Sequence, residues 1–249
     1  MKTAIATILW GKLHTIDDFR EVLSQVKGIG YDGIGFETKF LPKELLKDPS
    51  RIPPLLRDHA LENAGSYSGM LESEVEWAAE SRTPLLWVVV RREKKFREAL
   101  KRLEKFSKLA NKSSVIPALH NHLKTCFETE EQVAEALERI EGLKLCFDTA
   151  HARAMDIDSA NFIRRFRNQI ALVHLKDLRA KVPKSRVSFS KDFVNVGSGI
   201  VDFKIVMEAL SEVRYKGTLM LELDSARGKK PEELAREGFE RVMDLVQLL

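Results

Sequence analysis

Eight short β-type segments, each followed by a stretch with helical periodicity, constrain the fold of this chain more than any other feature. Segments such as LLWVVV and LMLEL are apolar at nearly every position, as is typical of parallel strands that are covered on both faces. Strands that alternate with helices pair in parallel through crossover helices. The predicted strands are Thr3–Ile8, Gly33–Glu37, Glu62–Ser68, Leu85–Val90, Val115–His122, Leu143–Thr149, Ala171–Asp177 and Thr218–Asp224.

Helix start and stop signals between these segments favour a ring of β/α units. Thr15 and Asp18 form a capping-box pattern ahead of a helical stretch that Gly28 and Gly30 are expected to end. Pro231 lies in the first turn of the last amphipathic stretch. We therefore predict a closed α/β fold, a (β/α)8 TIM barrel, whose last helix packs beside its first.

Length and composition are consistent with that fold. A TIM barrel takes about 250 residues, and no linker or composition break interrupts the chain, so one domain over residues 1–249 is predicted. The apolar start is interpreted as a strand and not as a signal peptide, and no apolar run reaches the length of a membrane span. A cytoplasmic protein is expected, and a homo-oligomer stays open.

Charge and cysteine content exclude other classes of protein. The net charge is only +4, and basic and acidic side chains mix along the helices, which does not make a nucleic-acid footprint. Cys126 and Cys146 have neither disulfide-framework nor zinc-knuckle spacing, so we expect buried reduced thiols. The richness in Lys, Glu and Arg favours a thermophilic, heat-adapted source.

Histidines and acidic residues gather at the carboxyl ends of four consecutive predicted strands, on the rim where TIM-barrel active sites are built. A lone histidine in an apolar strand is usually a core residue, but a buried carboxylate such as Asp148 is costly without a cation. The combination favours one divalent metal, Mn, Co, Zn or Mg. The residues concerned are His120, His122, Asp148, His151, His174, Lys176, Asp177, Glu222 and Asp224.

These strand ends resemble the motifs of the xylose isomerase-like TIM barrels, which include sugar epimerases, inosose dehydratases, dehydroshikimate dehydratases and type IV apurinic endonucleases. HNHLKTCFETEE resembles the inosose dehydratase pattern His-x-His-x-Gly-Thr, with Lys124 in place of the glycine. FDTAH, VHLKD, NVGSGIVDF and GTLMLELD resemble later motifs of the group. The resemblance implies a metal held by Glu, Asp, His and Glu, and the matching positions are His120, Asp148, His174 and Glu222.

The leading functional interpretation is a metal-dependent sugar or polyol-ketone isomerase or epimerase that removes a proton next to a polarised carbonyl. The expected base is Glu222, His122 or His151, and Lys176 is expected to steady the developing negative charge. Glu37, Lys176 and His122 are expected to bind a small polyhydroxylated substrate, although Glu37 also suits an ion pair. Because His120 replaces one family glutamate, a symmetric proton exchange between two carboxylates is disfavoured.

Three alternatives accompany this interpretation. The first is an inosose or ketosugar dehydratase, a lyase with the same site. The second is an apurinic endonuclease. The resemblance implies that such an enzyme would need three zinc ions and further histidines to bind them. It is disfavoured because AGSYSGML, VVVRREKK and VSFSKDFVNVG contain no histidine. The third is a non-catalytic sugar-binding barrel, motivated by the departures at His120 and Lys124.

Other conspicuous residues favour structural roles. Arg91 and Arg92 are expected on a solvated helix face, with an anion contact as the alternative. Trp10 and Trp87 are expected to be packing residues. The long irregular stretch Arg179–Gly199 follows the seventh strand, where loops of such barrels carry function.

Overall fold

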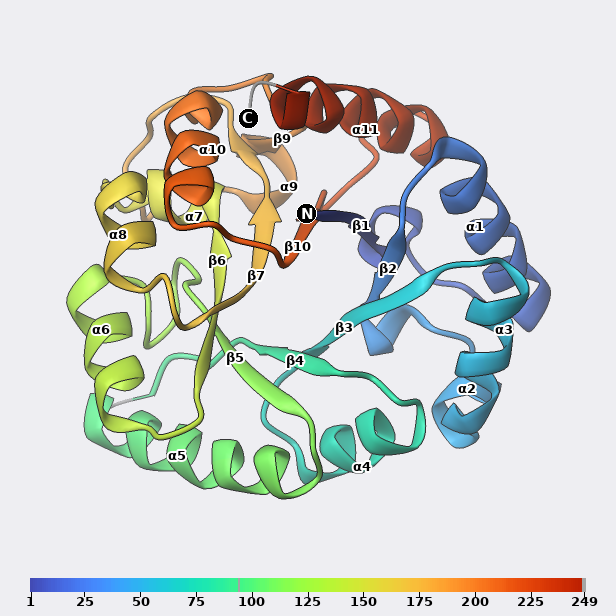
Figure 1. Cartoon of the computed structure of the whole chain (residues 1–249), viewed down its shortest axis with the longest axis horizontal. Coiled ribbons are helices and arrows are strands. Elements are labelled where there is room, and N and C mark those ends of the chain that lie inside the picture. Colours follow the sequence, from blue (N-terminus) through green and yellow to red (C-terminus); the bar gives the residue numbers. More distant parts are fainter. Residues whose placement is uncertain (94, 248–249) are drawn as a thin grey trace.

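The computed structural model describes residues 1–93 and 95–247. Eight parallel strands close a barrel in the order β1-β10-β7-β6-β5-β4-β3-β2 (Figure 1). This arrangement confirms the predicted TIM-barrel fold. The barrel strands are β1 (Lys2–Ala6), β2 (Gly33–Phe36), β3 (Glu62–Ser68), β4 (Leu85–Val88), β5 (Ile116–His120), β6 (Lys144–Asp148), β7 (Ile170–Leu175) and β10 (Thr218–Leu221).

Helices surround the barrel on all sides in Figure 1 and bury apolar side chains against the outer face of the strands. Within the described residues, no helix is both long enough and apolar enough to span a bilayer. The α-helices of the ring are α1 (Ile16–Ile29), α2 (Lys43–Lys47), α3 (Ile52–Asp58), α4 (Glu72–Glu80), α5 (Phe96–Lys112), α6 (Glu130–Arg139), α7 (Thr149–Ala154), α8 (Ser159–Arg165), α10 (Phe203–Glu212) and α11 (Pro231–Gln247). Short 3-10 helices are η1 (Thr7–Trp10), η2 (Thr38–Phe40) and η3 (Pro49–Arg51).

The sequence signals at the first and last helices are confirmed. Thr15 and Asp18 form the predicted capping box of α1, and Gly30, with φ of 119°, ends this helix in the left-handed conformation. Gly28 lies inside α1 and not at its end. Helix α11 packs beside α1, where the rings of Tyr31 and Phe239 lie 4.8 Å apart. The ring of helices is thereby closed.

Seven of the eight strands end one to three residues before their predicted carboxyl ends. Thr7 begins η1 and Thr149 begins α7, so the chain turns out of the sheet directly after the last strand residue. Buried side chains continue past these ends, so the apolar pattern in the sequence runs on beyond the last hydrogen-bonded strand residue. The residues that follow the strand ends, among them His122 and Lys176, therefore sit on rim loops.

The inside of the barrel is a second apolar layer, separate from the layer between strands and helices. It contains small residues together with Trp87, Cys146 and Met220. Cys126 and Cys146 are both buried and free, as predicted. Trp87 packs edge-on against His174, with ring centroids 5.2 Å apart. Trp10 donates from Nε1 to Gln25. Both tryptophans therefore have structural contacts.

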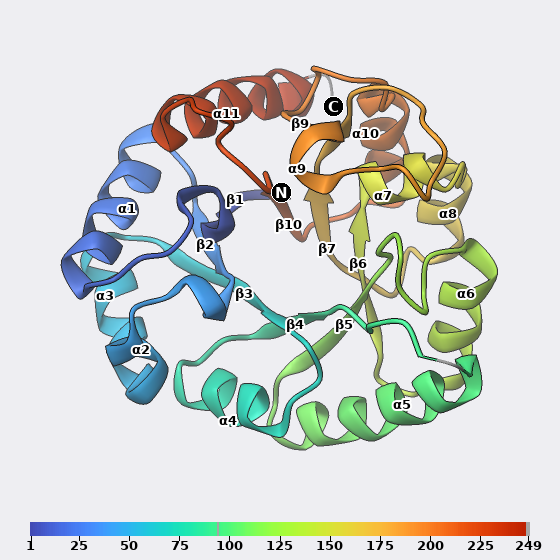
Figure 2. The same cartoon turned by 180° about the vertical axis from the view of Figure 1, so that it is seen from behind.

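The stretch after the seventh strand contains more secondary structure than predicted. A short antiparallel pair, β8 (Asp177–Leu178) and β9 (Phe193–Val194), encloses the single turn α9 (Phe189–Asp192). Figure 2, seen from the opposite side, shows α9 in front of the barrel close to β7. Phe189 and Phe193 stack with centroids 5.3 Å apart and lie against the ring of His151. This segment forms part of the wall around the rim histidines.

Candidate metal centre and pocket

The four predicted metal ligands meet at the carboxyl-terminal rim of the barrel. Asp148, His174 and Glu222 each offer a ligand atom, and these atoms all lie within 4.8 Å of one another. His120 joins them from β5, with its Nε2 3.4 Å from Asp148 Oδ2 and its ring centroid 4.9 Å from that of His174. All four side chains are buried. Two imidazoles and two carboxylates from β5, β6, β7 and the residue after β10 therefore form one cluster, in which Asp148 and His174 lie close to both His120 and Glu222.

The donor set suits a divalent cation. Both ring nitrogens of His120, Asp148 Oδ2 and His174 Nε2 are buried and have no hydrogen-bond partner in the described part of the chain. Glu222 Oε2 lies 2.7 Å from His174 Nδ1. Buried polar atoms of this kind are costly unless a partner satisfies them. Nitrogen and carboxylate donors from adjacent strands are ligands that first-row divalent metals accept. The residues present thus fit one metal ion.

The charge states of these residues also match those of metal ligands. Burial opposes the charge on Asp148, but His120 and Lys176 outweigh burial and lower the pKa of this carboxyl. Burial likewise opposes the charge on Glu222, whereas Lys176 and His174 hold its pKa well below the usual value. Burial lowers the pKa of His120 and keeps its ring neutral. Charged carboxylates and neutral imidazoles are the forms that bind metal.

Two residues that the sequence analysis did not single out hold the strands of the candidate metal centre in place through hydrogen bonds. Asn121 accepts from the backbone N–H of Asp148 at 2.8 Å and donates to its carbonyl at 3.0 Å. Thr149 Oγ1 donates to the carbonyl of Lys176 at 2.6 Å, and the backbone N–H of Lys176 donates back to it at 3.1 Å. The only local signal was their place inside the motifs HNH and FDTAH. Their role emerges from contacts between strands β5, β6 and β7.

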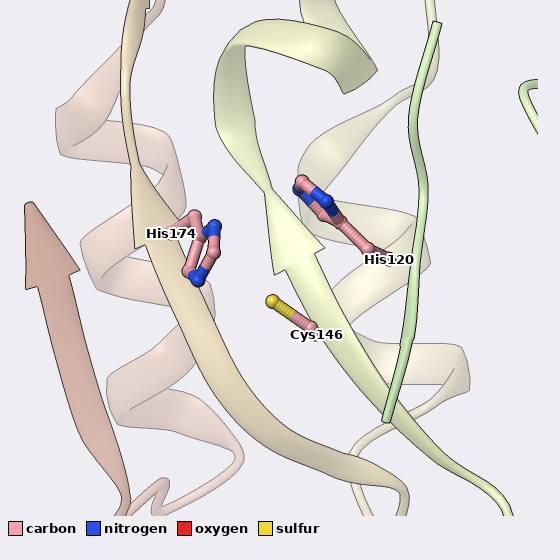
Figure 3. Close-up of side chains that lie close together, drawn as sticks. All are labelled: His120, Cys146 and His174. Atoms are coloured by element: carbon pink, nitrogen blue, oxygen red, sulfur yellow. The ribbon is translucent and has the colours of Figure 1, made fainter. Parts of the chain in front are cut away.

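Cys146 is the third side chain of another potential ligand group, with His120 and His174. Figure 3 shows its sulfur between the two imidazoles, on strand β6. Burial raises the pKa of this thiol well above its usual value, and the carboxylates of Glu222 and Asp148 add to the effect. A neutral thiol is a weak ligand, whereas Asp148 is charged. The carboxylate set is therefore the better metal site.

His122 donates a hydrogen bond through Nδ1, whereas His151 accepts one at Nδ1. Leu123 is the backbone partner of both. His122 Nδ1 lies 2.8 Å from the carbonyl oxygen of Leu123, which can only accept, so we assign the proton of His122 to Nδ1. The backbone N–H of Leu123 donates to His151 Nδ1 at 3.0 Å, so His151 carries its proton on Nε2. His122 is left with a free lone pair, and His151 is left with an N–H donor. The two rings lie 4.0 Å apart.

Lys176 is a buried cation at the centre of the acidic groups. Its Nζ lies 2.5 Å from Glu222 Oε1 and 3.0 Å from Asp224 Oδ2. Burial opposes the charge, but Asp224 and Glu222 outweigh it and raise the pKa of Lys176. Lys176 is therefore held as an ammonium group. This burial excludes an outward-facing, solvated lysine at this position.

A pocket of about 340 Å³ opens above these residues, within the size range of small-molecule sites. Burial raises the pKa of Glu37, which lines the pocket, to about 7, and the charge of Glu222 contributes. Glu37 also pairs with Lys39 at 3.3 Å, so both sequence readings of Glu37 have support. The pocket lining includes Glu37, Lys39, Tyr67, Arg91, Arg92, His122, Lys124, Phe189, Glu222 and Asp224.

Among the predicted metal, catalytic and substrate-binding residues, Glu37, His120, His122 and Glu222 line the pocket. Asp148, His151, His174 and Lys176 are buried and are not among its lining residues. Several other lining residues were not anticipated. Lys39, Tyr67 and Phe189 carry no motif, and they reach the pocket from η2, β3 and α9. Arg91 and Arg92 precede α5 and line the pocket, and they do not lie on a helix face as expected. Sequence periodicity extended the helical pattern too far toward the strand, because the connecting loop is rich in charged residues.

Comparison with known proteins agrees with the fold and the motifs. The chain is 31% identical over 143 residues to the inosose dehydratase of Clostridium tetani, which covers 53% of this chain and 48% of the relative. It is 30% identical over 133 residues to the inosose dehydratase of Geobacillus thermodenitrificans, with 49% and 45% covered. The chain spans about half the length of the curated relatives it matches.

Solved structures share the architecture over the whole chain. The IolI protein with a bound zinc atom superposes with a TM-score of 0.83 at 18% identity, covering 100% of this chain and 99% of the other. The probable 3-DHS dehydratase AsbF from Bacillus anthracis gives 0.80 at 15% identity, with 98% and 99% covered. An L-ribulose 3-epimerase gives 0.79 at 14% identity, with 99% and 95% covered. These identities establish the fold alone.

The family described as xylose isomerase-like TIM barrel matches residues 68–245, which is most of the chain and includes every predicted metal ligand. The closed barrel, the ligand cluster at its rim and this match agree. The chain belongs to the xylose isomerase-like TIM barrel family.

Proposed function

We propose that this protein is a metal-dependent enzyme that removes a proton from the carbon next to the carbonyl of a small polyol ketone and then eliminates water from it. The observation that carries the proposal is the meeting of His120, Asp148, His174 and Glu222 beside a pocket of about 340 Å³. These four residues would hold one divalent ion. When bound, such an ion polarises a carbonyl and acidifies the adjacent C–H bond.

The hydrogen-bond pattern narrows the choice of base to Glu222 and His122. The lone pair of His151 Nδ1 accepts from the backbone of Leu123, and His151 is buried and not among the residues that line the pocket, so His151 is not the base. His122 lines the pocket and keeps the lone pair of Nε2. Glu222 also lines the pocket, but one of its oxygens is bound to Lys176. Burial lowers the pKa of His122 to about 3, and Lys176 holds the pKa of Glu222 well below its usual value despite burial. Both are therefore unprotonated near neutrality and able to accept a proton, as weak bases.

Lys176 and Glu37 supply the remaining proton and charge chemistry. Lys176 is held as a buried ammonium group, so it stabilises negative charge that develops after proton removal. Glu37 approaches from β2, on the opposite side of the barrel from β6. A carboxyl with a pKa of about 7 is partly protonated near neutrality and suits the donation of a proton to a departing hydroxyl group.

Similarity to the inosose dehydratases favours elimination of water as the outcome. The isomerase or epimerase interpretation, which led on the sequence alone, becomes the second candidate. It is favoured because Glu37 follows β2 and His122 follows β5, so proton carriers from different walls of the barrel can take a proton from one side and return another elsewhere. Both candidates share the first step, which is removal of the proton.

The test is solvent-deuterium incorporation next to the carbonyl, with Mn, Co, Mg or Zn present. The panel comprises keto-inositols, ketohexoses, sugar keto-acids and dehydroshikimate. Loss of water with a new enone absorbance identifies a dehydratase, and deuterium entry without dehydration identifies an isomerase or epimerase. If no compound exchanges a proton with any of the metals, the proposal fails and the sugar-binding alternative replaces it.

One variant separates the two candidate bases. His122→Asn removes the free lone pair of His122 and keeps a polar side chain, so it abolishes exchange if His122 is the base. Exchange that persists in His122→Asn assigns the base to Glu222. Metal content of His122→Asn, measured by elemental analysis, serves as the control that the metal centre is intact. Incision of an abasic-site duplex by the metal-loaded protein would instead restore the endonuclease alternative.

A further inference from the structure

The mouth of the pocket is ringed by basic side chains from three different loops. Lys39 follows β2, Arg91 and Arg92 follow β4, and Lys124 follows β5, and all four line the same pocket. A neutral polyol needs hydrogen-bond partners but no excess of positive charge. The rim therefore requires an explanation beyond the chemistry at the metal centre.

The acidic groups of the pocket are already paired. Glu222 and Asp224 both lie against Lys176, and Glu37 pairs with Lys39. Glu222 and Asp224 share Lys176 and Glu37 has Lys39, so each carboxylate has a cationic partner and none of the three pairs with Arg91. Across residues 1–93 and 95–247, Arg91 forms neither an ion pair nor a side-chain hydrogen bond.

The loop that carries Arg91 is held in place from β5. Arg91 forms an isolated β-bridge with Thr125, and the backbone N–H of Cys126 donates to the carbonyl of Val90 at 3.2 Å. The neighbouring Arg92 lies 3.1 Å from the buried carboxylate of Glu128. These contacts fix the backbone of Arg91 at the edge of the pocket, while its exposed side chain has no partner of its own among the described residues and is free to bind a ligand.

Lys124 supplies a second unpaired charge beside Arg91. Its Nζ donates to the carbonyl of Val187 at 2.7 Å and lies 5.5 Å from the ring centroid of Phe189, without an ion pair to any described residue. These contacts hold the lysine over the pocket between the β5 loop and α9. Arg91 and Lys124 together leave the mouth with uncompensated positive charge.

We infer that the substrate of this pocket carries an anionic group, a carboxylate or a phosphate, which Arg91 binds at the mouth while the carbonyl end lies at the metal centre. The inference rests on the proposed function and specifies its substrate class. Arginine suits both anions because its guanidinium presents two parallel donors. Lys124 adds charge from the neighbouring loop.

The experiment compares charged and neutral ketoses on the metal-loaded protein. The probes are ketogluconate for a carboxylate, fructose 6-phosphate for a phosphate, and fructose and a keto-inositol as neutral compounds. Binding is measured by isothermal titration calorimetry, and turnover by deuterium exchange. We expect the charged probes to bind more tightly than the neutral ones, and added salt to weaken the charged probes alone.

Arg91→Gln is the test variant and Arg97→Gln is its matched control. Arg97 is exposed on α5, outside the pocket lining, so its replacement removes the same charge without touching the mouth. Arg91→Gln should weaken binding of one charged probe about tenfold to a hundredfold, as for loss of a charge-assisted hydrogen bond. Arg97→Gln should change it less than about twofold. The probe that depends on Arg91 identifies the anion.

The outcomes separate this inference from the proposed function. Charged probes that bind through Arg91 but do not exchange a proton would support the anion site and reject the proposed chemistry. Neutral probes that bind as well as the charged ones, or equal effects of the two arginine variants, would overturn the anion site. Absence of binding by both charged probes would overturn it as well.

Discussion

Lys176 and Asp148 show how the same buried environment gives neighbouring residues different tasks. Asp148 Oδ1 accepts from the backbone N–H of His151 at 2.8 Å and caps α7, which leaves Oδ2 directed toward His120. Lys176 offers no lone pair while it is protonated, and it neutralises Glu222 and Asp224. We therefore expect that loss of Asp148 affects metal binding and that loss of Lys176 affects turnover.

The replacement of these residues gives a two-part prediction. Asp148→Ala or Glu222→Ala should remove both bound metal and turnover, because each supplies a charged ligand. Lys176→Met should keep the metal and lower turnover, because its ammonium acts on charge that develops during the reaction. Metal content by elemental analysis and deuterium exchange by mass spectrometry check both.

Cys146→Ala serves as the control at the metal centre, since Cys146 contacts the ligand histidines without being assigned as a ligand. It should retain the metal, and the cobalt-substituted wild-type protein should show no sulfur-to-metal charge-transfer band. Loss of metal from Cys146→Ala, or retention by Asp148→Ala, would contradict the assigned ligand set.

At the scale of elements, Gly238 allows α11 to approach β10 closely. A Cβ added at Gly238 would clash with Leu221 Cδ2 and lie 2.7 Å from Asn195 Oδ1. Asn195 is itself bound to α11 through the carbonyl of Leu234 at 3.0 Å. Leu221 is the last residue of β10 and precedes Glu222, so the packing of this helix helps to position a metal ligand.

Gly238→Ala should destabilise the protein by about 1–3 kcal/mol, the usual cost of overpacking. This loss should appear even though alanine favours a helix over glycine by about 1 kcal/mol. Urea unfolding measures the change, and Glu240→Ala on the exposed face of α11 is the control, expected within about 0.5 kcal/mol of wild type. An increase in stability for Gly238→Ala would show that α11 moves away at no cost.

At the scale of the whole molecule, the barrel closes only when β1 pairs with both β2 and β10. Helix α11 then packs beside α1, so the two ends of the described chain depend on each other. The single domain over residues 1–249 remains a prediction. Closure of this kind favours cooperative unfolding.

We expect one unfolding transition in calorimetry, and a higher midpoint when a divalent metal is added. At a free metal concentration 100 times its Kd, binding stabilises the native state by about 2.7 kcal/mol. For a chain of this size, that corresponds to a rise of roughly 5–10 °C. Asp148→Ala should lose this rise and still unfold in one transition. Two separate transitions in the wild-type protein would contradict a single domain.

Much of the fold could be predicted because it depends on local patterns. Strand and helix segments, the Thr15 capping box and the start of α11 at Pro231 follow from residue spacing along the chain. The strand ends were predicted too long, because burial continues past the last hydrogen-bonded residue. Arg91 and Arg92 were misplaced on a helix for a related reason, since charged loops and charged helix faces have similar compositions.

The sequence by itself determined the barrel class and the ligand types, since periodicity and motifs are local properties of the chain. It named His120, Asp148, His174 and Glu222, but it left three residues open as the base. Only the tertiary structure decided that Leu123 fixes opposite tautomers of His122 and His151. Only it brought the basic rim residues from separate loops to one mouth. Hydrogen-bond direction and charge pairing depend on contacts between distant segments, which residue spacing does not encode.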